Sequence, residues 1–503
     1  MTVRNIIQDL LLLAIIISFV PISTCLLAVN YCYISLFPRS SIRRHLRKTP
    51  GFEPKTVLLS GVNTPQGLHL ARAFHDTGHD VIGVDMEPGG IPTPLRFSKA
   101  MHKFHASNET SADGIINEHV RFLTQIIRSE DVDLWINGTT SNHPILEAQV
   151  KELIEQTTKC RCFALSPDNA SRFTTRDAFL SHMHSLGLPV PEVHQVRSRD
   201  ELHKVLNKSL GRRKFLLHAP NREEPNRSRV RTPLPKRTLS QTYSLVSRIN
   251  ITQSSPWRLE QDTRELEKYS ALGVIVRGQV KAFVASFSTD DSSFELLDPK
   301  CALNQAMLRF VSSFVESQGL DFNTHLVIDF CVEDWVTATG VVKTILPVDI
   351  SIQGHRNILL YQGISGSVQL TRAYLAYLQP ADSPAKQEYG VKLSDTDHES
   401  PEKPVIPESK VARIYNFGEM VSQLVLKPLI GLLALRNTPK ASLRTLVLLV
   451  DRLLHWTDDL YSIKDPVPFW WFHQVQVPLG IIMNVIRGSS VSSHPHKQQW
   501  TSH

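Results

Sequence analysis

The chain has 503 residues, of which 42% are hydrophobic and 20% are charged, and this composition excludes wholesale disorder. Its length suits several domains with separate cores. The formal net charge of +7 is modest and comes partly from one basic run between Arg39 and Lys48, so it does not indicate a nucleic-acid-binding protein.

The cysteines exclude two further classes of protein. There are six, which is too few and too scattered for the disulfide framework of a small secreted domain. Cys160 and Cys162 form an isolated C-x-C, without the second pair that a structural zinc site needs. We therefore predict that the body of the chain lies in a reduced environment facing the cytosol.

The first predicted element is a membrane-spanning helix. The run from Leu10 to Phe37 is almost uncharged and longer than the roughly 20 residues that cross a bilayer. A cleaved signal peptide is the alternative, but it would have a shorter apolar core preceded by positive charge, and only Arg4 precedes this one. Because the basic run follows the apolar one, the positive-inside rule predicts a single-pass anchor with residues 49–503 in the cytosol.

Residues Lys55 to Asp85 predict one strand–helix–strand unit. The turn between Gly61 and Gly67 lacks the G-x-G-x-x-G pattern, so we interpret it as a turn that packs a helix on a sheet. A further helix and strands continue the alternation to residue 165. Alternating elements of this kind predict a parallel sheet with helices on both faces.

The next part of the chain predicts a helix followed by several strands. The helix lies within 171–196, and strands are predicted at 214–220, at 257–261 and in a hairpin over 270–287. The polar and basic stretch 221–240 is interpreted as a mobile loop.

A pair of strands between His325 and His355 follows, and it carries the strongest chemical signal. Each arm is apolar and ends near an acid, Asp329 or Asp349. If the arms pair with these two acids opposite each other, their carboxylates repel unless a cation lies between them. A hard divalent cation such as Mg²⁺, carrying a nucleotide phosphate, is the usual solution. The alternative is that one aspartate merely caps a strand end at a solvated rim.

The C-terminal part begins with a linker. Ser383–Lys410 is rich in Pro, Glu, Lys and Ser, and residues 411–488 alternate apolar helical stretches with an aromatic cluster, Phe469–Phe472. Those helices either lie in a membrane interface or form a helical cap on the body. Residues from Ser489 onward are predicted to be disordered.

The order of these elements resembles the ATP-grasp superfamily, and specifically the fungal membrane-anchored ATP-grasp proteins akin to carbamoyl-phosphate-synthetase-type ligases. It consists of an α/β unit, a helix ending in SLGLPVP, strands around a basic loop, a glycine hairpin and an acidic strand pair. The likeness covers about 52–370 and extends loosely to DPVPFWWFHQVQVPLG. It implies an α/β fold of the ATP-grasp (α+β) type. The predicted boundaries are an anchor with its basic flank (1–48), a pre-ATP-grasp parallel α/β domain (49–168), an ATP-grasp domain (169–375), a linker (376–410), a helical extension (411–488) and a disordered tail (489–503).

The resemblance also implies a metal site on the strand pair. Asp329 matches the acidic ligand on the first strand, and Asp349 stands at the Glu of the family's Glu-x-Asn-Pro-Arg run. Ser351 replaces the Asn of that run, and Gln353 replaces its Arg. Asp329, Asp349 and Ser351 are thus the predicted Mg²⁺ ligands. Gln cannot neutralise phosphate charge, so Arg222, Arg227 or Arg229 in the basic loop is expected to supply it. Of these, Arg229 is predicted to act with Gln353 in catalysis.

Nucleotide-binding residues are implied in the same way. Arg176 falls where a nucleotide-binding Lys is common, and His218 falls where a second phosphate-reaching Lys is expected. Glu260 and Gln261 stand at the adenine hinge, in the reverse of the usual order. Lys268 replaces an acid before the glycine hairpin.

The resemblance implies an ATP- and Mg²⁺-dependent ligase that joins a small-molecule carboxylate to an amine through an acyl phosphate, with a role in secondary-metabolite biosynthesis. Phosphoryl transfer depends mainly on positioning and charge neutralisation, so neighbouring residues can compensate for altered ones. The alternative is a catalytically degenerate membrane-bound scaffold or nucleotide sensor. A nicotinamide-dependent reductase is disfavoured because the glycine fingerprint is missing. The sequence identifies neither the two substrates nor the oligomeric state.

Overall fold

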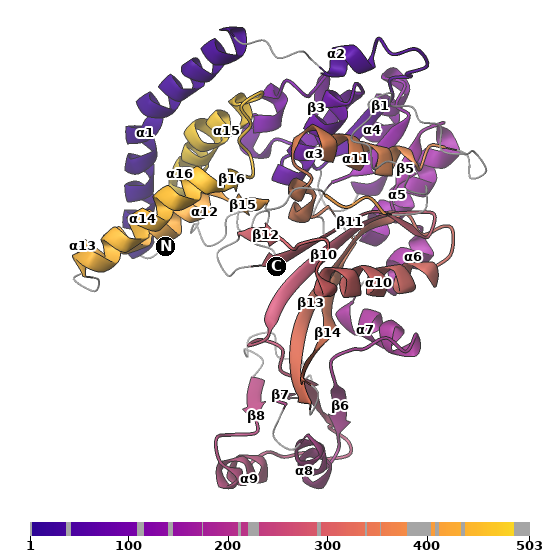
Figure 1. The fold of residues 1–503 in the computed structure, drawn as a ribbon, viewed down its shortest axis with the longest axis vertical. Helices are drawn as coiled ribbons and strands as arrows, with labels where there is room; N and C mark the ends of the chain where they lie inside the picture. Colours follow the sequence, from indigo (N-terminus) through magenta and orange to yellow (C-terminus); the bar gives the residue numbers. More distant parts are fainter. Residues whose placement is uncertain are drawn as a thin grey trace. The chain divides into compact units, whose positions relative to one another are not determined.

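The protein is described here from a computed structural model, and the chain divides into two compact units (Figure 1). Unit 1 comprises Met1–Thr175, Ser270–Ile328 and Ile350–His503, and unit 2 comprises Arg176–Tyr269 and Asp329–Asp349. Each unit is therefore built from segments that lie far apart in the sequence. The described residues are 3–36, 42–107, 115–138, 144–173, 175–209, 213–219, 231–288, 293–337, 340–352, 354–379, 404–407, 412–433 and 438–486.

The first sheet of unit 1 is parallel and has the strand order β3-β2-β1-β4-β5. Its strands are β1 (Thr56–Ser60), β2 (Asp80–Met86), β3 (Lys103–Ser107), β4 (Leu134–Asn137) and β5 (Arg161–Phe163). Successive side chains of β1 enter two different cores, because residues alternate across a strand. Val57 and Leu59 pack with α3 (Pro65–Asp76) and α11 (Gly363–Leu375), whereas Leu58 packs with α4 (Ile115–Ser129) and α5 (Pro144–Thr157). The predicted mixed α/β class and parallel sheet are confirmed.

The turn after β1 serves packing, as its sequence indicated. Gly61 has a φ of 66°, and a Cβ at Gly67 would lie 2.8 Å from the Cα of Val62, so the start of α3 approaches the turn closely. The backbone N–H of Asn63 donates to the carboxylate of Asp85 at 2.5 Å. Burial raises the pKa of Asp85 to about 6. The acid that ends β2 is thus engaged by the turn itself.

A seven-stranded sheet has the order β14-β13-β10-β11-β12-β15-β16. Its strands are β10 (Glu267–Val276), β11 (Gln279–Ser288), β12 (Phe294–Leu296), β13 (Thr324–Thr337), β14 (Gly340–Ser351), β15 (Arg413–Tyr415) and β16 (Thr457–Asp458). The predicted hairpin is formed by β10 and β11, with positive φ at both Arg277 and Gly278, as a tight two-residue turn requires. The helix α10 (Ala302–Glu316) contacts β11.

The sheet of unit 2 has the order β6-β9-β7-β8 and is antiparallel in each pair. Its strands are β6 (Val193–Val196), β7 (Phe215–His218), β8 (Arg231–Leu234) and β9 (Trp257–Gln261), and its helices are α7 (Arg176–Ser185), α8 (Arg199–Lys208) and α9 (Leu239–Ser247). The face formed by Phe215, Leu217 and Leu259 packs against Leu202 of α8 and Val246 of α9.

The interpretation of 221–240 as a loop was wrong for its second part. Residues 220–230 lie outside the described residues, but Arg231–Leu234 form strand β8 and Leu239 begins helix α9. Pro233 made this stretch look like a loop, because proline lacks the backbone N–H that pairs with a neighbouring strand. β8 is the edge strand of its sheet, where a proline is tolerated.

The C-terminal segment is more than a helical tail. It contributes β15 and β16 to the seven-stranded sheet, where β15 pairs with β12. Its helical part consists of α12 (Phe417–Val421), a π-helical turn (Ser422–Leu426), α13 (Lys427–Leu433), α14 (Pro439–His455), α15 (Val467–Trp471), a second π-helical turn (Phe472–Gln476) and α16 (Val477–Ile486). Within the predicted linker, Val405 accepts a backbone hydrogen bond from Phe283 and donates one to Lys281, so this part of the linker is fixed to β11.

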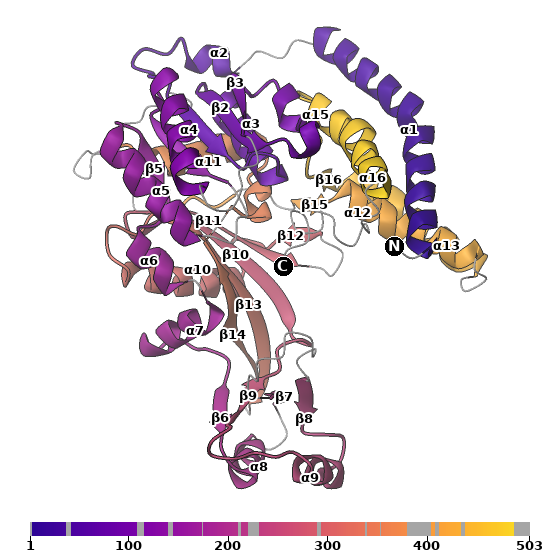
Figure 2. The ribbon, with the colours of Figure 1, turned by 180° about the vertical axis from the view of Figure 1, so that it is seen from behind.

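The N-terminal helix α1 (Val3–Leu36) contains the predicted anchor. Leu12–Leu36 is long and apolar enough to cross a membrane by length and composition, with a mean hydropathy of 2.6. It lies beside α15 and α16 (Figure 2). Asn30 donates to the hydroxyl of Tyr461 at 2.8 Å, and the indole N–H of Trp470 donates to Thr24 at 3.3 Å.

The C-terminal segment is held to the parallel sheet by a buried ion pair, and its loss should destabilise unit 1. Arg72 of α3 contacts Asp465 at 3.0 Å, and Ser98 donates to the same carboxylate at 2.6 Å. Asp465→Ala leaves the Arg72 charge buried without its partner, so the free energy of unfolding should fall by about 3–5 kcal/mol. Denaturant unfolding of the detergent-solubilised chain, followed by tryptophan fluorescence, measures this.

The neighbouring residue supplies the control. Lys464 pairs with Asp76 at 3.3 Å and its side chain is 56% exposed, so Lys464→Ala should cost less than about 1 kcal/mol. Equal losses for the two variants would contradict a stabilising role of the buried pair.

Candidate functional site

A charged surface covers the second face of the unit 2 sheet. His218 of β7 lies opposite Arg258 of β9 in the strand register, and Glu260 lies two residues along the same strand. Residues two apart share a face, so these three side chains project from one surface. The opposite face is apolar and covered by α8 and α9. Polar and apolar alternation along β9 therefore separates the site from the core.

Glu260 is the centre of this surface. Its carboxylate lies 2.6 Å from Nη1 of Arg176, 3.7 Å from Nε2 of His218 and 3.7 Å from Nη2 of Arg258. Its side chain is only 12% exposed, so the charge is largely removed from water. A carboxylate in this position is stabilised by the cations around it. The structure thus brings together three of the predicted nucleotide-binding residues: Arg176, His218 and Glu260.

Two further contacts fix the guanidinium groups. Arg176, at the start of α7, donates from Nε to the carbonyl of Val348 in β14 at 2.5 Å. Arg258 makes a bidentate contact with Asp177, at 2.6 and 2.7 Å. This hydrogen bonding lowers the pKa of the Asp177 carboxyl and raises the pKa of Arg258. Both arginines are therefore held in fixed positions around Glu260.

Gln261, the second half of the predicted adenine hinge, belongs to a different network. Its carbonyl accepts from the backbone N–H of Glu192 at 3.1 Å, and its amide donates to Glu333 at 3.0 Å. Arg213 makes two bonds to Glu333, at 3.1 and 2.9 Å, and also contacts Glu192. The predicted pair is divided because adjacent residues of a strand face opposite sides.

The two predicted metal-binding aspartates lie on neighbouring strands. Asp329 is half-buried on β13, and Asp349 is exposed on β14. Their pairing opposite each other stays a prediction. Cys331, two residues beyond Asp329, has its pKa raised mainly by burial, and its charged neighbours include Lys268, Asp329 and Arg176. Asp329 therefore lies in the same charged region as Arg176.

Other predicted site residues are less defined. Ser351 is half-buried at the end of β14. Gln353 and Arg229, predicted to act in catalysis, lie outside the described residues. Among the residues that the structure describes, no group of three or more His, Cys, Asp or Glu side chains gathers as a metal site.

Sequence reasoning missed several charged residues of these networks. They are Asp177, Glu192, Arg213, Arg258 and Glu333. The alternation in WRLEQ was a usable signal for Arg258, because it places that residue on the same face as Glu260. No local pattern indicated Arg213, whose two acidic partners are distant in sequence.

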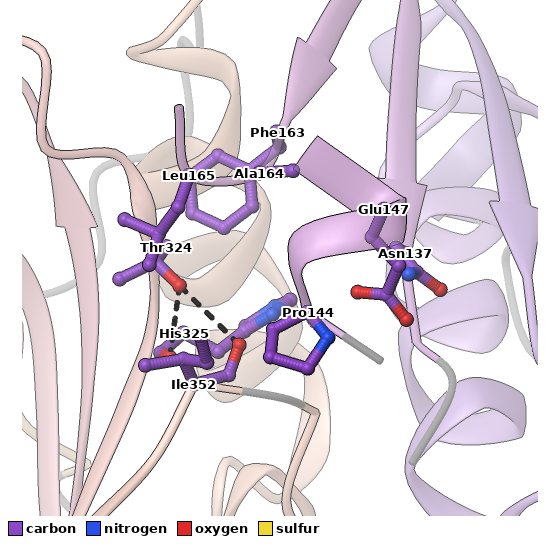
Figure 3. A pocket seen from close by; sticks show the side chains of 9 residues that line it. All are labelled: Asn137, Pro144, Glu147, Phe163, Ala164, Leu165, Thr324, His325 and Ile352. Atoms are coloured by element: carbon purple, nitrogen blue, oxygen red, sulfur yellow. Dashed lines mark hydrogen bonds between the residues drawn. The ribbon is translucent and has the colours of Figure 1, made fainter. Parts of the chain in front are cut away.

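A small cavity lies in unit 1 at the carboxyl ends of β4 and β5 (Figure 3). Open α/β sheets bind ligands at this edge. The cavity measures about 20 Å³, which is room for about one water molecule. Its lining residues are Asn137, Pro144, Glu147, Phe163, Ala164, Leu165, Thr324, His325 and Ile352. The hydroxyl of Thr324 is engaged by the protein itself, because it hydrogen-bonds to the carbonyls of His325 and Ile352.

His325 is the histidine in the lining of this cavity. Burial lowers the pKa of His325 to about 4, and the ring lies 2.6 Å from the hydroxyl of Tyr374. A neutral histidine at this point positions the base of β13 against α11. We assign it a structural role in unit 1.

No family model and no curated protein matches the sequence. Solved structures similar to the chain include an N5-carboxyaminoimidazole synthetase from Staphylococcus aureus, at 13% identity over 64% of this chain and 77% of that one, with a TM-score of 0.40. The biotin carboxylase subunit of a pyruvate carboxylase has 11% identity over 64% and 70%, with a TM-score of 0.46. A carboxyaminoimidazole ribonucleotide synthase from Aspergillus clavatus, complexed with ATP, has 15% identity over 65% and 78%, with a TM-score of 0.39. A fold hosts many activities, so function must be argued from the residues of a site.

The buried histidine predicts a pH dependence of stability. The unfolded chain binds a proton at His325 below its ordinary pKa of 6.5, whereas the folded chain does so only below about 4. This residue therefore adds stability as pH rises through that window, by up to about 1.4 kcal/mol per pH unit. His325→Gln should flatten the dependence of the urea midpoint on pH between those values. His184→Gln, at an exposed histidine of α7, is the control, and equal slopes for the two variants would contradict the assignment.

Proposed function

We propose that the chain is an ATP- and Mg²⁺-dependent ligase of the ATP-grasp type that joins a small-molecule carboxylate to an amine. One observation carries this proposal: Arg176, Arg258 and His218 surround Glu260 on one face of a sheet. The sequence placed two of these groups, Arg176 and His218, at phosphate-binding positions. Their meeting in three dimensions supports that placement.

The two arginines are suited to bind phosphate oxygens. A guanidinium presents a planar fork of donors that matches phosphate as well as carboxylate. The Glu260 carboxylate contacts one of these donors, Nη1 of Arg176, at 2.6 Å. A phosphate group carries more charge than a carboxylate, so it competes for the same donors. On this proposal Glu260 holds the arginine in place until nucleotide replaces it.

The residues of the strand pair fit a magnesium ion by their chemistry. Mg²⁺ is bound in proteins by one or two carboxylates together with substrate phosphates and water, and Asp329 and Asp349 supply two carboxylates. Ser351 would add a weaker oxygen ligand. When bound, the ion neutralises charge on the transferred phosphoryl group. Gln353 and Arg229 keep their proposed part in catalysis.

The location of the protein follows from its first helix. We place α1 across a membrane, as a single-pass anchor, with the body of the chain in the cytosol. The basic residues after it oppose translocation. ATP is a cytosolic nucleotide, so this orientation also supplies the proposed cofactor. A role in secondary-metabolite biosynthesis belongs to the same proposal.

A nucleotide sensor without turnover is the second candidate. It is favoured by the ion pair of Arg176 with Glu260, which leaves the arginine neutralised, and by the uncharged Gln353 in place of an arginine. Calorimetric titration separates the two candidates. Binding of ATP with no release of ADP favours the sensor, and no binding at all favours a scaffold.

The ligase proposal predicts ATP turnover that depends on Arg176. The full chain in detergent, given ATP, Mg²⁺ and a library of amino acids, should release ADP and phosphate with at least one acceptor. Arg176→Ala removes a charged hydrogen bond to phosphate, so the dissociation constant for ATP should rise about 10- to 100-fold. Calorimetry and a coupled ADP assay measure both effects.

The control replaces an arginine outside the site. Arg264 pairs only locally with Asp262 and its side chain is 55% exposed, so Arg264→Ala should leave ATP affinity within about twofold. Loss of affinity in both variants, or in neither, would count against Arg176 as a phosphate ligand. No turnover across the library would reject the ligase.

The proposed orientation predicts that the glycosylation motifs stay unmodified. The sequons at Asn137 and Asn169 are buried, but those at Asn207 and Asn250 are exposed and would be modified in the lumen. Endoglycosidase treatment of microsomes should therefore leave the mobility of the chain unchanged. A co-expressed secreted glycoprotein shows that the transferase is active. A mobility shift of the intact chain would show that its body lies in the lumen, where it has no access to cytosolic ATP.

A further inference from the structure

The helix α14 carries an apolar stripe that the described part of the chain does not cover. Its members recur every three or four residues, which is one face of a helix. Val447 is 62% exposed and Leu454 is 73% exposed. The stripe consists of Leu443, Leu446, Val447, Val450, Leu453 and Leu454. Exposed apolar faces of this extent mark a binding surface.

A different side of α14 attaches this helix to the rest of unit 1. Leu449 of α14 and Trp456 just beyond it pack against the buried cluster of Tyr415, Met420 and Leu424. The N-terminus of the helix is capped by Thr438, whose side chain accepts from the backbone N–H of Ala441. The stripe is therefore held on a fixed helix and points away from the cluster that anchors it.

Basic residues lie beside the stripe on the polar side of the helix. Lys440 and Arg444 are exposed there. Arg452 is half-buried, and its guanidinium lies 5.4 Å from the centre of the Trp456 ring. Asp451 is the acid of the same face. An amphipathic helix with cations beside its apolar face has the pattern of helices that lie in the surface of an anionic membrane.

Other exposed apolar side chains lie on helices of the same side of unit 1. Ile17 and Leu26 of α1 and Ile486 of α16 are exposed, and α1 contacts both α15 and α16. Figure 1 shows α14 on the side of unit 1 that carries α1 and α16. A span-length apolar helix and an amphipathic helix thus belong to one side of the unit.

The aromatic cluster Phe469–Phe472 packs mainly on the protein. The indole N–H of Trp471 donates to the carbonyl of Pro92 at 2.9 Å, and its ring lies 4.1 Å from that of Phe97. Phe472 is buried in the core of unit 1. Exposed apolar side chains of the C-terminal segment are therefore concentrated on α14, with further ones on α16.

We propose that α14 lies in the interfacial layer of a lipid bilayer with anionic headgroups, as a second membrane contact independent of the α1 span. Its leucines and valines enter the acyl region, and Lys440 and Arg444 meet the headgroup phosphates. A second copy of this chain is the rival occupant of the stripe. The flanking cations favour lipid, because two copies would bring the same positive charges together.

Site-directed fluorescence of the full chain tests this proposal. The exposed cysteines of α1 are removed by Cys25→Ala and Cys32→Ala, and Cys301→Ser keeps the cap that its sulfur gives to Asn304. An environment-sensitive dye is attached at Val447→Cys on the stripe or, as the matched control, at Ala441→Cys, an exposed position on the opposite side of the helix. The chain is reconstituted in phosphatidylcholine vesicles with about one-third phosphatidylserine, the type of anionic surface that such helices bind.

The vesicles contain lipids with a nitroxide near the top of the acyl chain. The nitroxide quenches a dye that lies close to it, so the loss of emission reports the depth of the dye in the bilayer. An interfacial helix buries its apolar face roughly 5–10 Å, so the dye at 447 should lose more than about half of its emission and the dye at 441 little. Lys440→Glu with Arg444→Glu should weaken the quenching at 447 in anionic vesicles, with a smaller effect in phosphatidylcholine alone. Each labelled chain must keep the unfolding midpoint of the unlabelled one.

The contrary outcomes are distinct. Equal quenching at 447 and 441, or none at either, overturns the proposal. A dye at 447 that is shielded but unquenched, with disulfide cross-linking of two chains in a separate, unlabelled sample of Val447→Cys, assigns the stripe to a dimer. A dye at Ile17→Cys reports on α1 separately. If 17 is quenched and 447 is not, only the α14 proposal fails, whereas failure at 17 rejects the anchor.

Discussion

A carboxylate that is largely removed from water needs positive charge close to it, and in unit 2 this need is met at Glu260. The side chain stands on β9, and its partners come from the start of α7, from β7 and from β9 itself. Arg176 extends the connection to β14 through the carbonyl of Val348. One partly buried charge thus holds together segments that are far apart in the sequence. Removing any one cation would leave the others to stabilise a charge in a region of low dielectric.

The same arrangement would have a consequence for the proposed binding of a nucleotide phosphate. Charges that already compensate one another have lost most of their hydration, so a phosphate that takes over the guanidinium of Arg176 pays little additional desolvation for it. Glu260 loses its ion pair with Arg176 in this exchange, and its carboxylate must then be stabilised by water or by another cation. The affinity of the site for a phosphate is then the difference between two ion pairs. Such a site discriminates by charge and geometry more than by total binding energy.

The architecture was largely predictable because its signals are local. Alternating strand and helix patterns gave the parallel sheet, and the Arg277-Gly278 turn gave the β10–β11 hairpin. Strand β8 was missed because Pro233 is typical of loops, and only its place at a sheet edge makes it tolerable. The site was predicted in part. Arg176, His218 and Glu260 were named individually, but the ion pairs between them depend on strand register. The separation of Gln261 from Glu260 follows from alternation along β9, so WRLEQ could have indicated it once it was taken as a strand.

The buried pair of Arg72 and Asp465 shows why the C-terminal segment cannot be treated as an appendage. Arg72 lies on α3, against the first sheet of the chain, and it also donates to the carbonyl of Leu460. Arg356 contacts Asp459 at 2.7 Å in the same manner. Both arginines would be left in the protein interior without acids if the segment were absent, and uncompensated buried charge is among the most destabilising changes known in proteins. Unit 1 therefore folds with its C-terminal segment in place: the ion pairs fix the stretch between α14 and α15, and apolar packing of Leu449 and Trp456 fixes α14 itself.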